Sequence, residues 1–70
     1  MNVNVDVLMN MLKKEEMKFT QHGEVLEFDT ENGQLEVIPD GAVYLIQTPS
    51  VNDVAYDEME ALSIIRKWVK

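Results

Sequence analysis

The first apolar residues of the chain follow the spacing of an α-helix. Four of them stand at i, i+3, i+4 and i+7 and therefore share one side of a helix: Val5, Leu8, Met9 and Leu12. Asn4 or Asp6 can cap this helix, because a short side-chain oxygen accepts hydrogen bonds from the free N–H groups of the first turn. Residues 2–7 alternate like a strand, but the apolar residues at 8–12 break that alternation. The pattern predicts a helix from about Asp6 to Glu16.

Between residues 17 and 48 the pattern changes to the alternation of β-strands, interrupted by turn signals. Asn32-Gly33 predicts a two-residue type I′ hairpin turn, whose central residues both need positive φ. Residues 39–41 predict a three-residue turn, with Gly41 in the left-handed position of a bulge. A short strand at residues 17–21, turned at His22-Gly23, precedes these hairpins. The pattern predicts an antiparallel meander of three to four strands.

A second amphipathic helix completes the pattern. Pro49 ends the last strand, and Ser50, Asn52 or Asp53 can cap a helix that runs to about Val69. Its apolar stripe has helical spacing: Ala55, Met59, Leu62, Ile65 and Val69. Two helices that flank a meander can cover one face of its sheet. The sequence therefore predicts one two-layer α+β domain over residues 1–70, in the order α-β-β-β-β-α with a short first strand.

The two predicted turns determine which side chains share a face of the sheet. The first turn puts Phe28 opposite Val37, and the second puts Val37 opposite Val43. Six apolar residues then face the helices: Leu26, Phe28, Leu35, Val37, Val43 and Leu45. The same registers put Asp29 directly opposite Glu36 on the other face, within a mixed set of acidic and apolar residues: Glu27, Asp29, Glu31, Glu36, Ile38, Tyr44 and Ile46.

These seven outer residues are the candidate site. Like charges directly opposite each other destabilise a sheet by up to about 1 kcal/mol, and local folding rules do not require the Asp29–Glu36 pair. Acids on a sheet can also serve only to keep it soluble and to prevent edge-to-edge aggregation. Clustered exposed apolar groups, however, mark interfaces. We interpret this face as partner-binding, with the solubilising role as the alternative.

The distribution of charge restricts the kind of partner. The net charge is −7, and the six Lys and Arg residues lie toward the two ends of the chain, three at each. From residue 19 to residue 65 there are ten acids and no basic residue. This acidic central segment repels nucleic acids and anionic membranes, whereas it attracts basic protein surfaces. We expect a protein partner with a basic surface, no direct nucleic-acid binding and no membrane.

Catalytic, metal and cofactor motifs are weak or missing in the sequence. Without cysteine the chain has neither a disulfide nor a thiolate metal site. His22 is the only histidine and adjoins Gly23 in a predicted turn, with no visible orienting partner. Residues 29–40 do not match a calcium loop, because Gly33 comes one position early. The start lacks the basic region and cleavage motif of a signal peptide. We expect a soluble, cytoplasmic, non-enzymatic protein without a cofactor or metal.

Two functions follow from these expectations. The first is a small acidic interaction module that binds a basic protein surface through the outer face. In size, charge and compactness the chain resembles the small acidic inhibitors encoded by phages and mobile elements, anti-CRISPR proteins among them; no motif carries this likeness, so it transfers no residues. The second is a structural or assembly homodimer that uses the apolar part of the same face: Ile38, Tyr44 and Ile46, together with Trp68.

Overall fold

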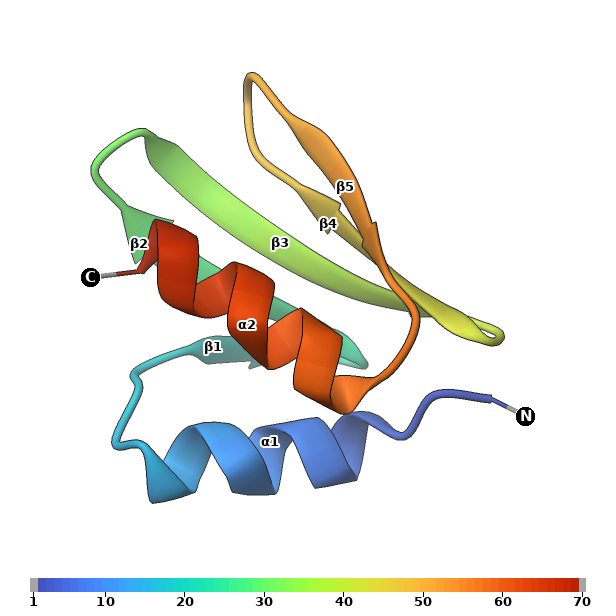
Figure 1. The fold of residues 1–70 in the computed structure, drawn as a ribbon. Coiled ribbons are helices and arrows are strands. Elements are labelled where there is room, and N and C mark those ends of the chain that lie inside the picture. Colours follow the sequence, from blue (N-terminus) through green and yellow to red (C-terminus); the bar gives the residue numbers. More distant parts are fainter. Residues whose placement is uncertain (1, 70) are drawn as a thin grey trace.

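The computed structural model describes residues 2–69, which form two helices and five strands (Figure 1). Their bounds are α1 Val5–Lys14, β1 Thr20–His22, β2 Val25–Thr30, β3 Gly33–Asp40, β4 Val43–Gln47, β5 Asn52–Ala55 and α2 Glu58–Trp68. Neighbouring strands are antiparallel and lie in chain order across the sheet. The predicted α+β meander between two helices is confirmed, with five strands instead of three to four.

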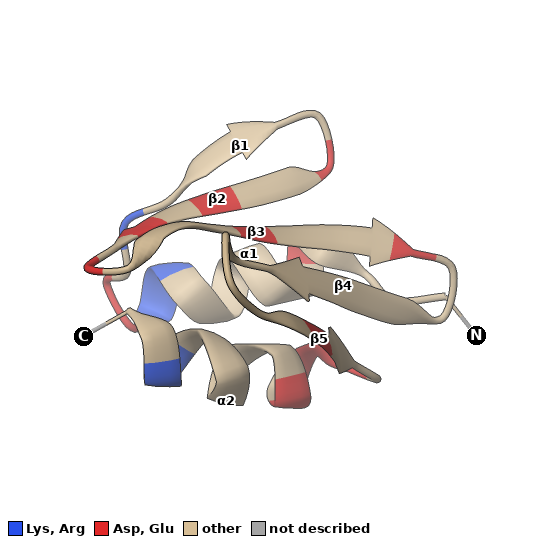
Figure 2. Ribbon diagram, turned by 90° about the horizontal axis from the view of Figure 1, so that it is seen from above, with Lys and Arg blue, Asp and Glu red and all other residues tan. Residues whose placement is uncertain are grey.

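Both helices lie on one face of the sheet and cover the hydrophobic core (Figure 2). Residues from both helices and from β2 to β5 form this core: Leu8, Leu12, Leu26, Phe28, Leu35, Val37, Tyr44, Ile46, Ala55, Ala61, Leu62, Ile64 and Ile65. Arg66 of α2 binds the carboxylate of Glu15, directly after α1, through two guanidinium nitrogens, one of them Nε at 2.9 Å from Oε1. Because the guanidinium hydrogen bonds favour the ionised carboxylate, they lower the pKa of Glu15.

The first helix forms close to its predicted position. Asn4 is its N-cap, and the Asn4 side chain accepts hydrogen bonds from the backbone N–H of Asp6 at 3.0 Å and of Val7 at 3.4 Å. Leu8 and Leu12 are fully buried, as the apolar stripe predicts. The helical interpretation of residues 5–12 is therefore confirmed over the strand interpretation.

The turn between β2 and β3 differs from the predicted type I′ turn. Thr30 pairs with Gly33, so the turn residues are Glu31 and Asn32, and the positive φ falls on Gly33 at 110°. A glycine directly after the turn is typical of a bulged hairpin. Phe28 consequently pairs with Leu35 instead of Val37. Because this register shift is an even number of residues, β2 and β3 keep the predicted faces.

The turn between β3 and β4 changes the faces of β4. Asp40 pairs with Val43, so the turn has two residues, and Gly41 takes its first central position with a φ of 63°, as in a type II′ turn. Val37 therefore pairs with Ile46 instead of Val43. This shift is an odd number of residues, and an odd shift exchanges the two faces of a strand. The predicted outward positions of Tyr44 and Ile46 are wrong: both side chains are buried under the helices.

The segment after Pro49 forms a strand before it becomes helical. Residues 52–55 pair with β4 as β5, and α2 begins only at Glu58, with Asp57 as its N-cap. The predicted caps at Ser50, Asn52 and Asp53 are therefore wrong, whereas the predicted end of the helix near Val69 is confirmed. The Asp57 side chain accepts from the Glu60 backbone N–H at 2.8 Å, so a local acceptor decides where the helix starts.

Candidate protein-binding surface

The sheet face opposite the two helices is not covered by any element within residues 2–69 (Figure 2). We call it the uncovered face. Its side chains alternate along each strand with those of the core, so it receives residues 36 and 38 of β3, and 43, 45 and 47 of β4. Two rows of side chains cross this face from strand to strand, one apolar and one polar.

The apolar row consists of Val25, Ile38, Leu45 and Val54. Ile38 pairs with Leu45, and Leu45 pairs with Val54. Val25 stands beside Ile38, because it lies one residue beyond the registered Leu26–Val37 pair. All four side chains are partly open to solvent, and Val54 is 37% exposed. Adjacent apolar side chains on four strands form a continuous strip, unlike apolar residues scattered singly over a surface.

The polar row runs beside the apolar row and carries the acids. Glu27 pairs with Glu36, Glu36 pairs with Gln47, and Gln47 pairs with Asn52. Asp29 lies two residues further along β2, exposed and opposite Gln34. The like-charge pair on this face is therefore Glu27–Glu36, and the predicted Asp29–Glu36 pair is wrong. The predicted outward positions of Glu27, Asp29, Glu36 and Ile38 follow from the register.

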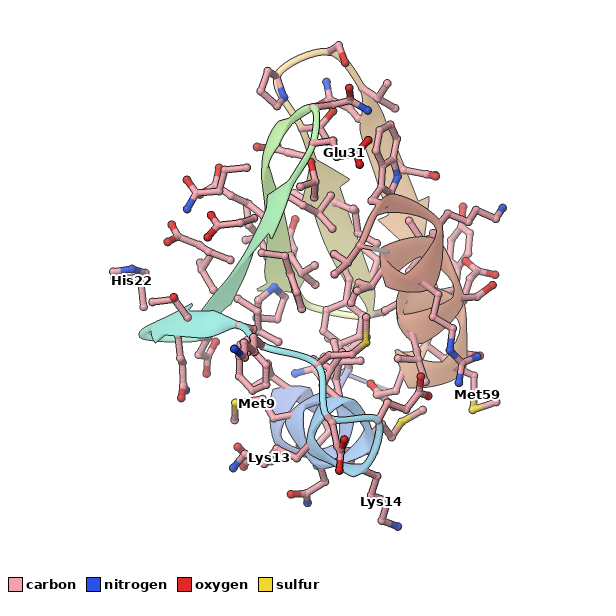
Figure 3. All side chains as sticks on the ribbon, turned by 90° about the vertical axis from the view of Figure 1, so that its left-hand side faces the viewer. Met9, Lys13, Lys14, His22, Glu31 and Met59 are labelled. Carbon is pink, nitrogen blue, oxygen red and sulfur yellow. The ribbon has the colours of Figure 1, made fainter. Side chains whose placement is uncertain are left out.

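Glu27 has two polar partners, one on each neighbouring strand. His22 Nε2 of β1 lies 3.0 Å from Glu27 Oε1, and Gln34 Nε2 of β3 donates to the same oxygen at 3.2 Å. Figure 3 shows His22 projecting on the side of the molecule away from α2 and Met59. The two contacts fix the Glu27 carboxylate in place. Glu36 has no such partner among the described residues, so its carboxylate is available to a bound group.

Three of the predicted site residues do not belong to the uncovered face. Glu31 is a turn residue between β2 and β3, and Tyr44 and Ile46 are in the core. Val43 and Leu45, predicted for the core, take the outward positions on β4 and are partly exposed. The signal for this arrangement is Gly41, which suits the first central position of a two-residue turn as well as a bulge.

Val25 and Val54 belong to the apolar row although the sequence prediction did not include them in the site. Val25 follows directly from the confirmed alternation of β2, in which Leu26 and Phe28 are buried. Val54 depends on β5, a four-residue strand at the edge of the sheet. A strand this short gives little periodic signal in the sequence, so Val54 could not be placed before the fold was known.

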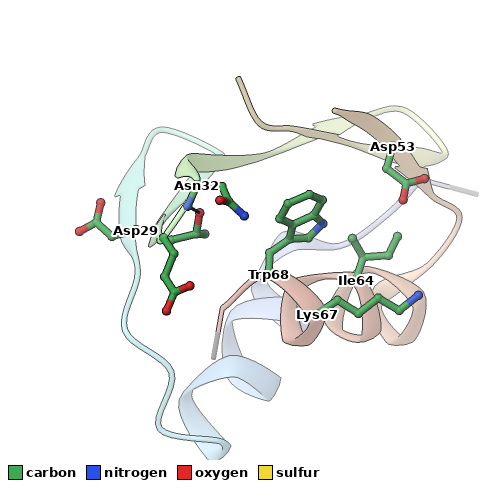
Figure 4. A pocket seen from close by; sticks show the side chains of 8 residues that line it. Asp29, Asn32, Asp53, Ile64, Lys67 and Trp68 are labelled. Carbon is green, nitrogen blue, oxygen red and sulfur yellow. Dashed lines mark hydrogen bonds between the residues drawn. The ribbon is translucent and has the colours of Figure 1, made fainter. Parts of the chain in front are cut away.

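A groove lies at another part of the molecule, between the β2–β3 turn and the end of α2. It has a volume of about 720 Å³ and is lined by residues of both elements and by Asp53. Figure 4 shows Trp68 between Asn32 and Ile64 in this groove. Trp68 is half-buried and packs against the core. The groove is lined by acids and by Lys67 together, so its charge selects a ligand less clearly than the uncovered face does.

The described residues offer little for metal or acid–base chemistry. Within residues 2–69 no group of three His, Asp or Glu side chains is placed to hold a metal ion. The His22–Glu27 pair is the nearest approach to an acid–base site, but the His22 side chain is 63% exposed. General catalysis needs a positioned substrate next to such a pair. Here the pair links β1 to β2 at an open surface.

Comparisons with known proteins give no relative from which a function could be transferred. No protein-family model, curated protein or solved structure matches the chain. The two described helices have 10 and 11 residues, and neither has the length and apolar character needed to cross a bilayer. The surface of the molecule is therefore what indicates a function.

Proposed function

We propose that this protein is a non-enzymatic interaction module that binds a basic protein surface through the uncovered face. The observation that supports it is the pair of neighbouring rows on that face, Val25–Ile38–Leu45–Val54 beside Glu27–Glu36. The other face of the same sheet is covered by both helices. A sheet with one covered face and a continuous apolar strip on the other has a surface that a partner can dehydrate.

The two rows make different contributions to binding. Burial of the apolar row removes hydrophobic surface from water, which stabilises a complex by roughly 25 cal/mol per Å² of apolar area. The carboxylates attract Lys and Arg over longer distances and orient the partner before contact. Since alternate residues on a strand are about 6.6 Å apart, the partner should present apolar and basic side chains at a similar separation.

The density of acids matches a short basic groove better than a nucleic-acid site. Carboxylates two residues apart on a strand are separated by about 6.6 Å, whereas duplex DNA carries one charge per roughly 1.7 Å of its axis. The face is too sparsely charged to replace a whole duplex. It can instead occupy a small basic groove on a protein and act there as an inhibitor or regulator.

A homodimer through the same face is the competing function. After the correction of β4, it would use the apolar row in place of Tyr44 and Ile46. Face-to-face packing of two copies brings both sets of acids toward one interface without basic residues among them, and like charges at an interface oppose association. Light scattering on the purified protein distinguishes the two functions, because a face-to-face homodimer gives twice the monomer mass.

The test compares two charge-reversal variants of equal net charge. Glu27→Lys/Glu36→Lys changes the uncovered face, whereas Glu24→Lys/Glu31→Lys changes two exposed turn residues. A tagged wild-type chain is used to capture partners from a lysate, and each captured protein is purified and titrated against all three chains. We expect the first variant to lose binding and the second to retain it.

A further pair of substitutions tests the apolar row. Ile38→Ser/Leu45→Ser leaves the charge unchanged and should weaken the same complex. If both charge variants bind equally well, or the serine variant binds like the wild type, the uncovered face is not the binding surface.

A further inference from the structure

Exposed apolar side chains gather around the free edge of β5. The large hydrophobic side chains that are exposed within residues 2–69 are Val7, Val51, Val54, Tyr56 and Met59. Four of these five belong to residues 51–59, which comprise β5 and the start of α2. Tyr56 is 69% exposed and Met59 68% exposed. Since β5 is the last strand of the sheet, one side of its backbone faces away from β4.

The hydrogen-bond pattern identifies which backbone amides face outward. The Thr48 N–H donates to Val51 O at 2.8 Å, so this pair is a hydrogen-bonded one. Hydrogen-bonded and non-hydrogen-bonded pairs alternate along an antiparallel ladder. Leu45–Val54 is therefore a non-hydrogen-bonded pair, and the N–H and C=O of Val54 point to the outer edge. Tyr56 follows directly after the end of β5, and its N–H has a side-chain acceptor in α2 instead of a partner in β4.

Two carboxylates accept from the backbone N–H groups of Val54 and Tyr56. Asp53 Oδ1 accepts from the Val54 N–H at 2.8 Å, and Glu60 Oε1 accepts from the Tyr56 N–H at 3.0 Å. An unpaired edge invites another strand, and proteins commonly block such edges with charged side chains. The two acids therefore close the edge to a strand that cannot replace their hydrogen bonds.

We propose that the β5 edge accepts an extended Lys- or Arg-bearing segment of the partner by strand addition, with Asp53 and Glu60 exchanging their contacts. The N–H groups of Val54 and Tyr56 then donate to carbonyls of the added strand. The displaced carboxylates accept from its basic side chains. This inference rests on the basic partner of the proposed function, and it extends the uncovered face by one strand beside Val54.

Charge complementarity selects a basic segment over a neutral one or a second copy. A neutral strand would satisfy the two amides but would leave both exposed carboxylates with water in place of their protein donors. A second copy would bring another Asp53 and Glu60 to the same edge, and like charges in adjacent strands are destabilising. A strand with basic side chains also gives the displaced carboxylates charged donors.

The experiment uses a short blocked peptide, Lys-Val-Lys-Val-Lys, and the ¹⁵N-labelled full chain. Amide shifts and hydrogen exchange are recorded during titration. We expect the Val54 and Tyr56 amides to shift and to exchange more slowly with the Lys peptide. We expect no such effect with Glu in place of Lys, nor with alternate peptide amides N-methylated. The N-methylated peptide keeps its charge but loses the donors that strand pairing requires.

A paired variant separates the edge from the uncovered face. Asp53→Asn/Glu60→Gln keeps side-chain oxygens that can cap the amides but removes both charges. This variant should bind the Lys peptide about three- to tenfold more weakly than the wild type, as expected for the loss of two exposed ion pairs. The proposal would be overturned if the shifts and exchange rates of the Val54 and Tyr56 amides did not change at saturating peptide. It would also be overturned if the N-methylated peptide bound as tightly as the unmethylated Lys peptide. If this variant still captures the partner and Glu27→Lys/Glu36→Lys does not, the partner binds the uncovered face and not the β5 edge. Strand addition would then be rejected, and the proposed function would be preserved.

Discussion

One hydrogen-bonded side chain, Tyr44, joins the sheet to both helical segments. Its hydroxyl donates to Glu58 Oε2 at 2.8 Å, and the Asn4 backbone N–H donates to the same oxygen at 2.9 Å. Tyr44 is fully buried. Burial, and secondly the hydrogen bond to Glu58, raise the pKa of the Tyr44 phenol well above its ordinary value. The buried Tyr44 hydroxyl thus has a hydrogen-bond partner. A phenylalanine at this position would have no hydroxyl and would need no partner.

Tyr44→Phe should lower the free energy of unfolding by about 1.5–3 kcal/mol, the range for a hydrogen bond to a charged group. Tyr56→Phe is the matched control, because Tyr56 is 69% exposed; it should change stability by less than about 0.5 kcal/mol. Urea denaturation at neutral pH measures both. Equal effects of the two substitutions would contradict a stabilising role for the Tyr44–Glu58 bond.

The Tyr44 hydrogen bond also predicts a dependence on alkaline pH. The folded state holds the phenol proton more tightly than the unfolded state, whose pKa is about 10. The stabilisation is therefore complete below about pH 10 and falls as the pH rises above it. Denaturation of wild type and Tyr44→Phe over this range should show the difference between them shrinking only on the alkaline side.

Among the elements, the β2–β3 hairpin shows how a register can be tested by charge. Glu36 lies opposite Glu27, whereas Asp29 lies opposite the neutral Gln34. Glu36→Lys should therefore stabilise the protein by about 0.2–1 kcal/mol, since it replaces a like-charge pair with an opposite-charge pair. Asp29→Lys makes the same change in net charge without that benefit. An equal gain for Asp29→Lys, measured by thermal unfolding, would support the Asp29–Glu36 pairing and refute this register, because either substitution would then relieve the same like-charge pair.

The strand β4 shows why an element can be predicted while its orientation is not. Residues 42–46 are all apolar, so either set of alternate side chains could face a core. The orientation depends on whether the preceding turn has two or three residues. Gly41 suits both turns, because each needs positive φ at one position. The faces of β2 were predictable because Leu26 and Phe28 alternate there with Glu27 and Asp29.

The charge of the whole molecule acts over its full width. The chain carries a net charge of −7 and has a radius of gyration of 10.8 Å. The Debye length is about 30 Å at 0.01 M salt and about 8 Å at 0.15 M. At low salt nearly all the acids therefore repel one another, and at physiological salt only near neighbours do. This repulsion favours the unfolded chain and keeps folded molecules apart.

An increase in sodium chloride from about 0.01 M to 0.15 M should accordingly raise the unfolding temperature. Each 1 kcal/mol of relieved repulsion raises the midpoint by about 4–8 °C for a domain of this size. The Asp29→Lys/Glu36→Lys variant, whose net charge is −3 instead of −7, should respond less. Calorimetry at the two salt concentrations measures the difference, and an equal or larger response of the variant would show that the sheet acids do not dominate the repulsion.

The sequence by itself determined the features that depend on neighbours along the chain. These are the Asn4-capped first helix, the alternating faces of β2 and β3, and an acidic surface opposite the core. Tertiary structure decided the orientation of β4 and the existence of β5, because both depend on contacts between distant segments. Tyr44 is oriented inward where Glu58, 14 residues away, accepts a hydrogen bond from its hydroxyl. Residues 52–55 become a strand because β4 offers them a free edge, which no local pattern in their own sequence records.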